Sequence, residues 1–248
     1  MDEPTDLRDR LAMGETLVGA WSVLPGAVAA RTTAACQGLD YLVIDMQHGG
    51  AGETELPGMC AATTAHGVAP LVRVRSPTFA DVGRALDLGA HGVLLPNLGG
   101  PDHVSEVLGH CRYGPTGTRS YGQLVPAVPD PLCVVMLETR AAFENLAAIA
   151  RLPGLDAIYV GPIDLALSLG HKPHGPDADD TPMTAVLTEI VQTCRAHGVA
   201  VGVHTSHGRD ARRYRDLGAQ LVTAAADATV LAESVGAQIE LARSSSRP

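Results

Sequence analysis

Eight short apolar runs recur at fairly even spacing along this chain of 248 residues. Each run is nearly continuous in Val, Leu, Ile and Ala, which is typical of a strand buried on both faces. Eight such units in a chain of this length predict one closed (β/α)₈ barrel of the α/β class and favour it over an open sheet. The runs are Leu17–Leu24, Tyr41–Met46, Pro70–Arg75, Gly92–Asn97, Leu132–Glu138, Ala157–Gly161, Val199–His204 and Leu221–Ala226.

Segments with helical periodicity lie between most of these runs. We expect helices over Thr139–Leu152 and Pro182–His197, each of which ends beside a glycine. The joints "LDLGAHGVLLP", "LPGLDAIYVGP" and "RDLGAQLVTAA" resemble one another, because each leaves a helix near a Gly and enters an apolar run. Repeated units of this kind indicate a parallel sheet with right-handed crossovers.

The whole chain, 1–248, is predicted to form a single barrel domain. Residues 1–14 are expected to add an extra N-terminal helix, and residues 243–248 a polar tail. Tyr113–Pro131 is rich in Gly and Pro, so it predicts a loop where a barrel would ordinarily have a helix.

Charge and composition exclude several kinds of partner. The formal net charge is −9, from 18 basic and 27 acidic residues, and no basic run could follow a phosphate backbone, so we expect no nucleic-acid partner. No apolar run has the length of a transmembrane helix, and the N-terminus lacks a signal-peptide pattern, so a soluble, cytoplasmic protein is predicted. The five scattered cysteines include no Cys-x-x-Cys pair, which argues against a disulfide framework or a zinc ribbon.

Polar residues that end the apolar runs are the functional candidates, because the active site of such a barrel lies at the C-terminal ends of its strands. These residues are Asp45, Gln47, His48, Arg73, Arg75, Asn97, Glu138, Gly161, Asp164, His204, His207 and Asp227.

Glu138 and Asp164 follow neighbouring runs, so their carboxylates could converge on one hard cation. Mg²⁺ or Mn²⁺ accepts few protein carboxylates and keeps several waters, which leaves positions for a bidentate substrate. The alternative is that each acid caps a helix or is solvated in a loop.

His48, with Asp45 nearby, is the best general acid/base candidate, and the alternative is a surface-loop histidine. Arg73 is predicted to point into the barrel mouth, where it needs an anionic partner. That partner is either a substrate oxyanion or, in a structural ion pair, Asp45 or Asp87. His204 and His207 suggest a zinc site only weakly without a third ligand, and we interpret them as pocket or loop residues.

The single lysine, Lys172, lies in the His-, Pro- and Gly-rich segment "GHKPHGPD". A Schiff-base aldolase needs a lysine at a strand end in an apolar pocket, so that mechanism is nearly excluded. If the reaction passes through an enolate, stabilisation by a metal is the strategy that remains.

The sequence resembles the HpcH/HpaI family of metal-dependent class II pyruvate aldolases over most of its length. The resemblance is carried by "DYLVIDMQHGG", "PLVRV", "ALDLGAHGVLLPN", "VVMLETRAAFENLAAI", "LPGLDAIYVGPIDLALSLG" and "YRDLGAQLVTAAADATVL". It implies a barrel assembled as a homo-oligomer, a hexamer or trimer of dimers, with the last helix exchanged between partners.

The resemblance also implies roles for particular residues. Glu138 and Asp164 would hold the divalent metal, Mg²⁺ or Mn²⁺ with Co²⁺ possible, and Arg73 would bind the oxygen of pyruvate and its enolate. His48 would act as base through water, supported by Asp45 and Asp87. The substrate-binding residues would be Gly161, Ile163 and Asp164, through their backbone amides, together with Gln47.

The activity so implied is cleavage or formation of the C3–C4 bond of a 4-hydroxy-2-oxo acid, giving pyruvate and an aldehyde. Three departures from the family pattern bear on specificity. The family commonly has Glu where Gln47 stands and Gln where Met136 stands, and Arg119–Pro131 is much shorter than its family counterpart. Two alternatives stay open: decarboxylation of oxaloacetate at the same site, and a non-catalytic barrel.

Overall fold

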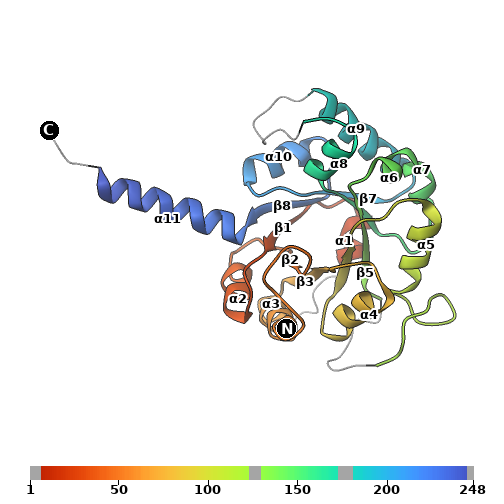
Figure 1. Ribbon diagram of the computed structural model, residues 1–248, viewed down its shortest axis with the longest axis horizontal. Coiled ribbons are helices and arrows are strands. Elements are labelled where there is room, and N and C mark those ends of the chain that lie inside the picture. Colours follow the sequence, from red (N-terminus) through yellow and green to blue (C-terminus); the bar gives the residue numbers. More distant parts are fainter. Residues whose placement is uncertain (1–6, 123–129, 173–180, 245–248) are drawn as a thin grey trace.

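Eight parallel strands close into a barrel in the computed structural model, which describes residues 7–122, 130–172 and 181–244 (Figure 1). Each strand pairs with the next in sequence, and β1 pairs with β8, so the predicted (β/α)₈ fold is confirmed. The strands are β1 (Leu17–Ser22), β2 (Tyr41–Asp45), β3 (Ala69–Arg73), β4 (Gly92–Leu95), β5 (Leu132–Leu137), β6 (Ala157–Val160), β7 (Ala200–Val203) and β8 (Leu221–Ala226).

Helices surround the barrel in the order expected for repeated β–α units (Figure 1). They are α1 (Leu7–Ala12), α2 (Ala27–Ala34), α3 (Leu56–Thr64), α4 (Phe79–Asp87), α5 (Pro101–Gly109), α6 (Arg140–Glu144), α7 (Leu146–Ile149), α8 (Pro162–Ser168), α9 (Thr181–Ala196), α10 (Gly208–Asp216) and α11 (Asp227–Arg243).

One predicted helix is interrupted. The segment Thr139–Leu152 forms two short helices, α6 and α7, which meet at Asn145. The Asn145 side chain donates to the carbonyl of Ala141 at 2.8 Å, and its backbone leaves helical geometry at φ −105° and ψ 11°. Asn competes with the helical backbone through such local hydrogen bonds, which accounts for the break.

Alternate residues of each strand face the barrel interior. On β7 the inward positions are Ala200 and Gly202, and His204 continues the same series just beyond the strand. A Cβ at Gly202 would lie 2.2 Å from the ring of Tyr159, so glycine leaves space for this tyrosine inside the barrel. Leu7 and Leu11 of α1 pack on the interior cluster and cover its N-terminal end.

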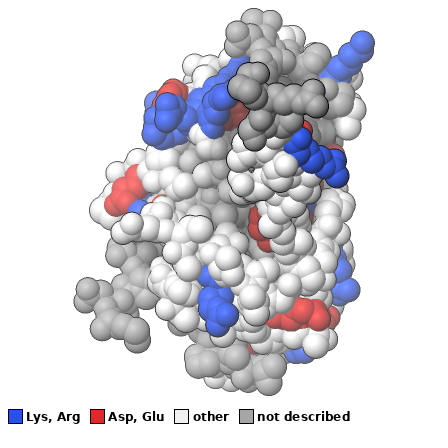
Figure 2. All heavy atoms as spheres, turned by 90° about the vertical axis from the view of Figure 1, so that its left-hand side faces the viewer, with Lys and Arg blue, Asp and Glu red and all other residues white. Residues whose placement is uncertain are grey.

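The last helix, α11, projects away from the barrel (Figure 1). None of its residues is buried, although it carries five large apolar side chains that are at least 40% exposed. They are Val230, Leu231, Val235, Ile239 and Leu241. Figure 2, which views the molecule from this side, shows a largely uncharged face with scattered acidic and basic residues. Several large apolar side chains exposed on one helix are typical of a binding surface.

Within the described ranges, no helix is long and apolar enough to cross a membrane. The predicted loop Tyr113–Pro131 begins with turns and a bridge between Tyr113 and Arg119, and residues 123–129 lie outside the described part. Residues 1–6 of the predicted N-terminal helix and 245–248 of the polar tail also lie outside it.

Candidate active site

Strand alternation brings polar side chains from several strands to the C-terminal mouth of the barrel. Asp45 and Arg73 end β2 and β3 on their inward faces. Glu138 directly follows β5, two residues beyond the inward-facing Met136. This end of the barrel is where enzymes of this fold carry their active sites.

The carboxylates of Glu138 and Asp164 approach the same point, Gly161. A Cβ on Gly161 would lie 3.3 Å from Oε2 of Glu138 and 3.8 Å from Oδ2 of Asp164. Burial raises the pKa of Glu138 above its ordinary value, and the negative charge of Asp164 adds to the rise. Both carboxylates therefore lie near the same point beside Gly161, where the absence of a Cβ leaves them room.

Asn97 holds the other oxygen of Glu138. The Asn97 backbone N–H donates to Oε1 of Glu138 at 2.7 Å, although Asn97 has φ of 57°, in the left-handed region. Asn is one of the few residues with a side chain that adopts this region readily. The sequence placed Asn97 at a strand end, but this unusual backbone geometry and its role in orienting Glu138 were not predicted.

Arg73 forms an ion pair with Asp45 in the barrel mouth. Its Nε donates to Oδ1 at 2.9 Å and its Nη2 to Oδ2 at 2.5 Å. Among the described residues its third nitrogen, Nη1, makes no hydrogen bond. The structural ion pair considered in the sequence is thus present, and one guanidinium nitrogen is still available to a ligand.

Asp45 receives donors from three further residues. Trp21 Nε1 donates to Oδ2 at 3.1 Å, and the backbone amides of Gln47 and His48 donate to Oδ1 at 2.9 and 3.1 Å. Burial alone would raise the pKa of Asp45, but the hydrogen bonds and charge of Arg73 outweigh it and hold the pKa below its ordinary value. Trp21 was missed in the sequence, although it is the single tryptophan and lies near the end of the first apolar run.

His48 is connected to Asp45 through its backbone. Asp45 accepts from the backbone N–H of His48 and so fixes the loop that carries His48; within the described part of the chain it makes no hydrogen bond to the imidazole. The His48 side chain is exposed at the mouth, close enough for its charge to lower the pKa of Glu138. Gln47 is half-buried in the same loop.

Asp87 does not pair with Arg73. Its Oδ1 accepts from Nη2 of Arg119 at 2.9 Å, and Arg119 also lies over the ring of Tyr113, 4.7 Å from its centroid. Asp87 therefore anchors the start of the Gly- and Pro-rich segment. In the described ranges Asp87 has Arg119 as its ion-pair partner, and support of His48 by Asp87 stays a prediction.

The remaining strand-end candidates have separate positions. Arg75 makes an exposed ion pair with Asp81 at 2.9 Å. Asp227 accepts from Ser22 Oγ at 2.8 Å and joins the end of β1 to the start of α11. Lys172 is exposed after α8, away from the barrel interior.

The two predicted pocket or loop histidines differ. His207 is exposed and pairs with Glu233 of α11 at 2.9 Å. His204 instead continues the inward series of β7, beside Trp21.

The two carboxylates fit a hard divalent cation. Glu138 and Asp164 face a common space, and their mutual repulsion in a partly buried site is relieved when a cation lies between them. No group of three or more His, Cys, Asp or Glu side chains suited to a metal occurs in the described part of the chain. A pair of carboxylates suits Mg²⁺ or Mn²⁺, which fill their other positions with water or substrate.

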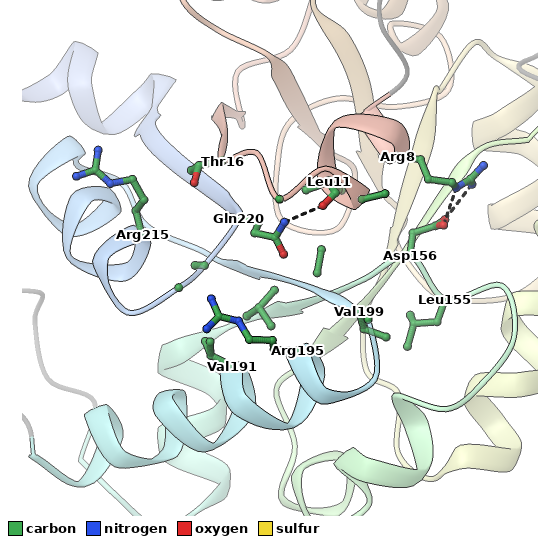
Figure 3. Close-up of a pocket in the computed structure, with 17 residues that line it drawn as sticks. Arg8, Leu11, Thr16, Leu155, Asp156, Val191, Arg195, Val199, Arg215 and Gln220 are labelled. Atoms are coloured by element: carbon green, nitrogen blue, oxygen red, sulfur yellow. Dashed lines mark hydrogen bonds and ion pairs between the residues drawn. The ribbon is translucent and has the colours of Figure 1, made fainter.

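A cavity of about 520 Å³ lies at the opposite end of the barrel (Figure 3). It is bounded by α1, the end of α9 and the entries to β7 and β8. Its polar groups are already engaged in part, since Gln220 donates to the carbonyl of Leu11 at 2.9 Å and Arg8 pairs with Asp156 at 2.7 Å. The N-terminal end of such a barrel serves stability, so we place the chemistry at the carboxylate end.

A closed parallel barrel with two carboxylates and an arginine at its C-terminal mouth has the architecture of a TIM-barrel enzyme. The model of the HpcH/HpaI aldolase/citrate lyase family matches residues 20–234. The chain belongs to the HpcH/HpaI aldolase/citrate lyase family, as its sequence motifs indicated, and it is a carbon–carbon lyase of the aldolase type.

Individual relatives agree with this assignment. The chain is 30% identical to a hydroxypyruvate/pyruvate aldolase of Rhizorhabdus wittichii, covering 93% of this chain and 95% of the relative. It is 29% identical to a 5-keto-4-deoxy-D-glucarate aldolase of Salmonella paratyphi C, covering 90% and 91%. The crystal structure of an HpcH/HpaI aldolase/citrate lyase family protein from Burkholderia cenocepacia superposes with a TM-score of 0.88 at 29% identity, covering 97% of this chain and 100% of that one.

Proposed function

We propose that the enzyme is a metal-dependent class II aldolase that cleaves or forms the C3–C4 bond of a 4-hydroxy-2-oxo acid. The products of cleavage are pyruvate, released from its enolate, and an aldehyde. The observation that carries this proposal is that the carboxylates of Glu138 and Asp164 both lie close to Gly161, with Arg73 in the same barrel mouth. The family membership and the aldolase relatives support it.

Glu138 and Asp164 are the residues that would hold a divalent metal, Mg²⁺ or Mn²⁺, with Co²⁺ as a further candidate. When bound, such a cation supplies positive charge that stabilises an enolate. The backbone amide of Asn97 holds one oxygen of the Glu138 carboxylate in place.

Arg73 is assigned to the 2-oxo oxygen of the substrate. Asp45 accepts from its Nε and Nη2, so the guanidinium is already held in position before a substrate binds and Nη1 is the nitrogen that can contact the substrate. A preorganised donor stabilises the charge that develops on this oxygen as the C3–C4 bond breaks. The Gly161 amide already donates to Leu137 at 3.3 Å, which leaves the first-turn amides of Ile163 and Asp164 for the substrate carboxylate.

His48 is assigned to proton transfer. It would remove the C4 hydroxyl proton through a water molecule, the electrons of the C3–C4 bond would pass to the enolate, and the aldehyde would leave. Protonation of the enolate at C3 gives pyruvate, and the reverse sequence forms the bond. Gln47 lies beside His48 and is assigned to the edge of the substrate site.

We further infer that the enzyme acts as a homo-oligomer, a hexamer or trimer of dimers, in the cytoplasm. The support for assembly is α11, which has no buried residue and carries five large apolar side chains that are at least 40% exposed. Packing α11 on a neighbouring copy would bury them. The support for a reducing compartment is that all five cysteines are free.

The test is pyruvate release from a panel of 4-hydroxy-2-oxo acids and oxaloacetate, with Mg²⁺, Mn²⁺, Co²⁺ or EDTA. We expect metal-dependent pyruvate that is lost in Glu138→Ala. Pyruvate from oxaloacetate alone would instead indicate a decarboxylase. Release that persists in EDTA or in Glu138→Ala would overturn the proposal, as would no release from any substrate.

A further inference from the structure

Asp227 lies at the catalytic end of the barrel, where β8 passes into α11, yet it has no role in the proton transfer proposed for this site. It is the first residue of α11. The register of β8 and β1 places Ala226 opposite Trp21, so the next residues along, Asp227 and Ser22, lie beside each other. Because both strands end here, Asp227 stands next to the first loop of the barrel mouth.

The Asp227 carboxylate binds the start of the segment that follows β1. Its Oδ2 accepts from Ser22 Oγ at 2.8 Å, and its Oδ1 accepts from the Val23 N–H at 2.9 Å. The Leu24 N–H lies 3.4 Å from Oδ1 and 3.3 Å from Oδ2, so the two oxygens share it. Hydrogen bonds to an ionised carboxylate are stronger than neutral ones, and three consecutive residues are therefore fixed by one side chain.

This segment in turn holds the loop that carries His48. Val23 donates its N–H to Asp227, and its carbonyl accepts from the Gly50 N–H at 2.8 Å. Pro25 packs on the same glycine, because a Cβ at Gly50 would lie only 3.0 Å from the Pro25 Cδ. Gly50 is two residues after His48. Two consecutive hydrogen bonds through Val23 thus connect Asp227 to the His48 loop.

The His48 loop is consequently held at both of its ends. Asp45 accepts from the amides of Gln47 and His48 at its start, and Val23 accepts from Gly50 at its end. The His48 side chain is exposed, so the backbone of the loop largely sets where the imidazole can reach. A change at either end of the loop would move the imidazole relative to the substrate.

We propose that Asp227 is a positioning residue for the general base. Through Val23 it fixes the loop at the place from which His48 takes the C4 hydroxyl proton by way of water. A catalytic group displaced by about 1 Å can cost about 10²-fold in rate, so this link matters even though Asp227 touches no substrate. The inference rests on the proposed aldolase function and on the role assigned to His48.

The first test separates kcat from KM in metal-dependent pyruvate release, using the 4-hydroxy-2-oxo acid that the unaltered enzyme cleaves best. Asp227→Ala should lower kcat about 10²-fold. It should leave KM and the Mn²⁺ affinity measured by calorimetry nearly unchanged, because the arginine and the two carboxylates of the site have their own partners. Damage to the whole barrel mouth would change all three quantities.

Two further variants show whether the contacts of the carboxylate are responsible. Asp227→Asn keeps an acceptor oxygen for the Val23 N–H, so it should recover most of the activity and lose less than about fivefold in kcat. Glu233→Ala is the matched control on the same helix. It removes an exposed acid that pairs with His207, and it should keep the kcat of the unaltered enzyme.

A double-mutant cycle tests whether Asp227 acts through His48. His48→Ala alone should lower kcat about 10³-fold, as loss of a general base predicts. Once the imidazole is absent, its position no longer matters, so adding Asp227→Ala should lower kcat by less than about threefold more. Independent roles would instead multiply to a loss of about 10⁵-fold. If Asp227→Ala does not fold, Ser22→Ala, which removes one donor to the carboxylate, takes its place in the cycle.

The inference would be overturned by multiplying losses in the cycle, by an unchanged kcat in Asp227→Ala, or by an equal loss of Mn²⁺ affinity. In each of these cases metal-dependent pyruvate release by the unaltered enzyme would still support the aldolase proposal. If the unaltered enzyme releases no pyruvate, the proposed function itself is rejected, together with the positioning role that depends on it.

Discussion

Arg73 and Asp45 form a bidentate ion pair inside the barrel mouth, with Nε–Oδ1 and Nη2–Oδ2 distances of 2.9 and 2.5 Å. The Asp45 side chain is 1% exposed and that of Arg73 is 11% exposed. Asp45 also binds the amides of the loop carrying His48. One carboxylate thus orients the arginine of the site and the loop beside it.

Removing the charge of Asp45 should cost stability as well as activity. Asp45→Asn leaves Arg73 buried without its counter-charge, and breaking such a pair costs about 3–5 kcal/mol. For a chain of this size we expect Tm to fall by about 6 °C or more. Glu53→Gln is the control, because Glu53 pairs with Arg84 at the surface, and its Tm should stay nearly constant. If Asp45→Asn had the same Tm as the control, the Asp45–Arg73 ion pair would not contribute to stability as expected.

The same pair predicts how stability depends on pH. The folded pKa of Asp45 lies below its unfolded value of about 3.9, so its contribution is complete above that pH and disappears as pH falls through the folded pKa. Urea unfolding of the enzyme and of Asp45→Asn should therefore differ by a constant amount from neutral pH down to about 4, and converge below it. If the difference in unfolding free energy between the two proteins grew as the pH fell, the folded pKa of Asp45 would instead lie above its unfolded value.

The barrel could be predicted because its strands are buried on both faces and read as continuous apolar runs. Their positions at the ends of apolar runs then placed Asp45, Arg73 and Glu138 at the C-terminal end of the barrel, and the two-residue spacing from Leu71 predicted that Arg73 points inward. Partners were harder to predict. From the sequence, the partner of Arg73 could be a substrate oxyanion, Asp45 or Asp87. The partner is Asp45 because the register of β2 and β3 puts Asp45 directly opposite Arg73.

Features that depend on local backbone geometry could not be predicted from the sequence. The left-handed conformation of Asn97 and the helix break at Asn145 are set by hydrogen bonds that no periodicity records. The role of Trp21 was not predicted because an aromatic residue near the end of an apolar run usually indicates a buried core side chain. Its indole N–H gives it a second role, as a donor to Asp45.

Glu138→Gln should remove the metal-binding capacity of the site with little effect on folding. The amide is nearly isosteric, so it still accepts from the Asn97 N–H, but it lacks the charge that attracts a cation. We expect weaker Mn²⁺ binding by calorimetry and a loss of kcat/KM of about 10³-fold. Glu144→Gln, an exposed position on α6, is the control. Unchanged Mn²⁺ affinity in Glu138→Gln would reject Glu138 as a ligand.

Gly161→Ala should impair activity by crowding the two carboxylates. The added Cβ would lie 3.3 Å from Oε2 and 3.5 Å from Cβ of Glu138, so the Glu138 side chain must shift. We expect kcat/KM to fall by about 10²-fold while Tm changes by a few degrees at most. Gly83→Ala, inside α4 with no atom within 4 Å of its new Cβ, should keep full activity and raise stability by about 0.5–1 kcal/mol. Equal activity of the two variants would show that Gly161 does not shape the site.

Fluorescence of Trp21 should report directly on ligand binding. Trp21 is the single tryptophan of the chain and is 2% exposed, so its emission should be shifted to the short wavelengths of a buried indole. The indole donates to Asp45 and lies against both Arg73 and His204, and a 2-oxo acid bound by Arg73 would change the charges around it. Titration with pyruvate in the presence of Mg²⁺ should therefore change the emission with a saturable dependence. The response should disappear in Glu138→Gln and persist in Glu144→Gln. An emission that saturating pyruvate leaves unaltered, in an enzyme that exchanges pyruvate protons, would show that the substrate lies away from the Trp21–Arg73 pair.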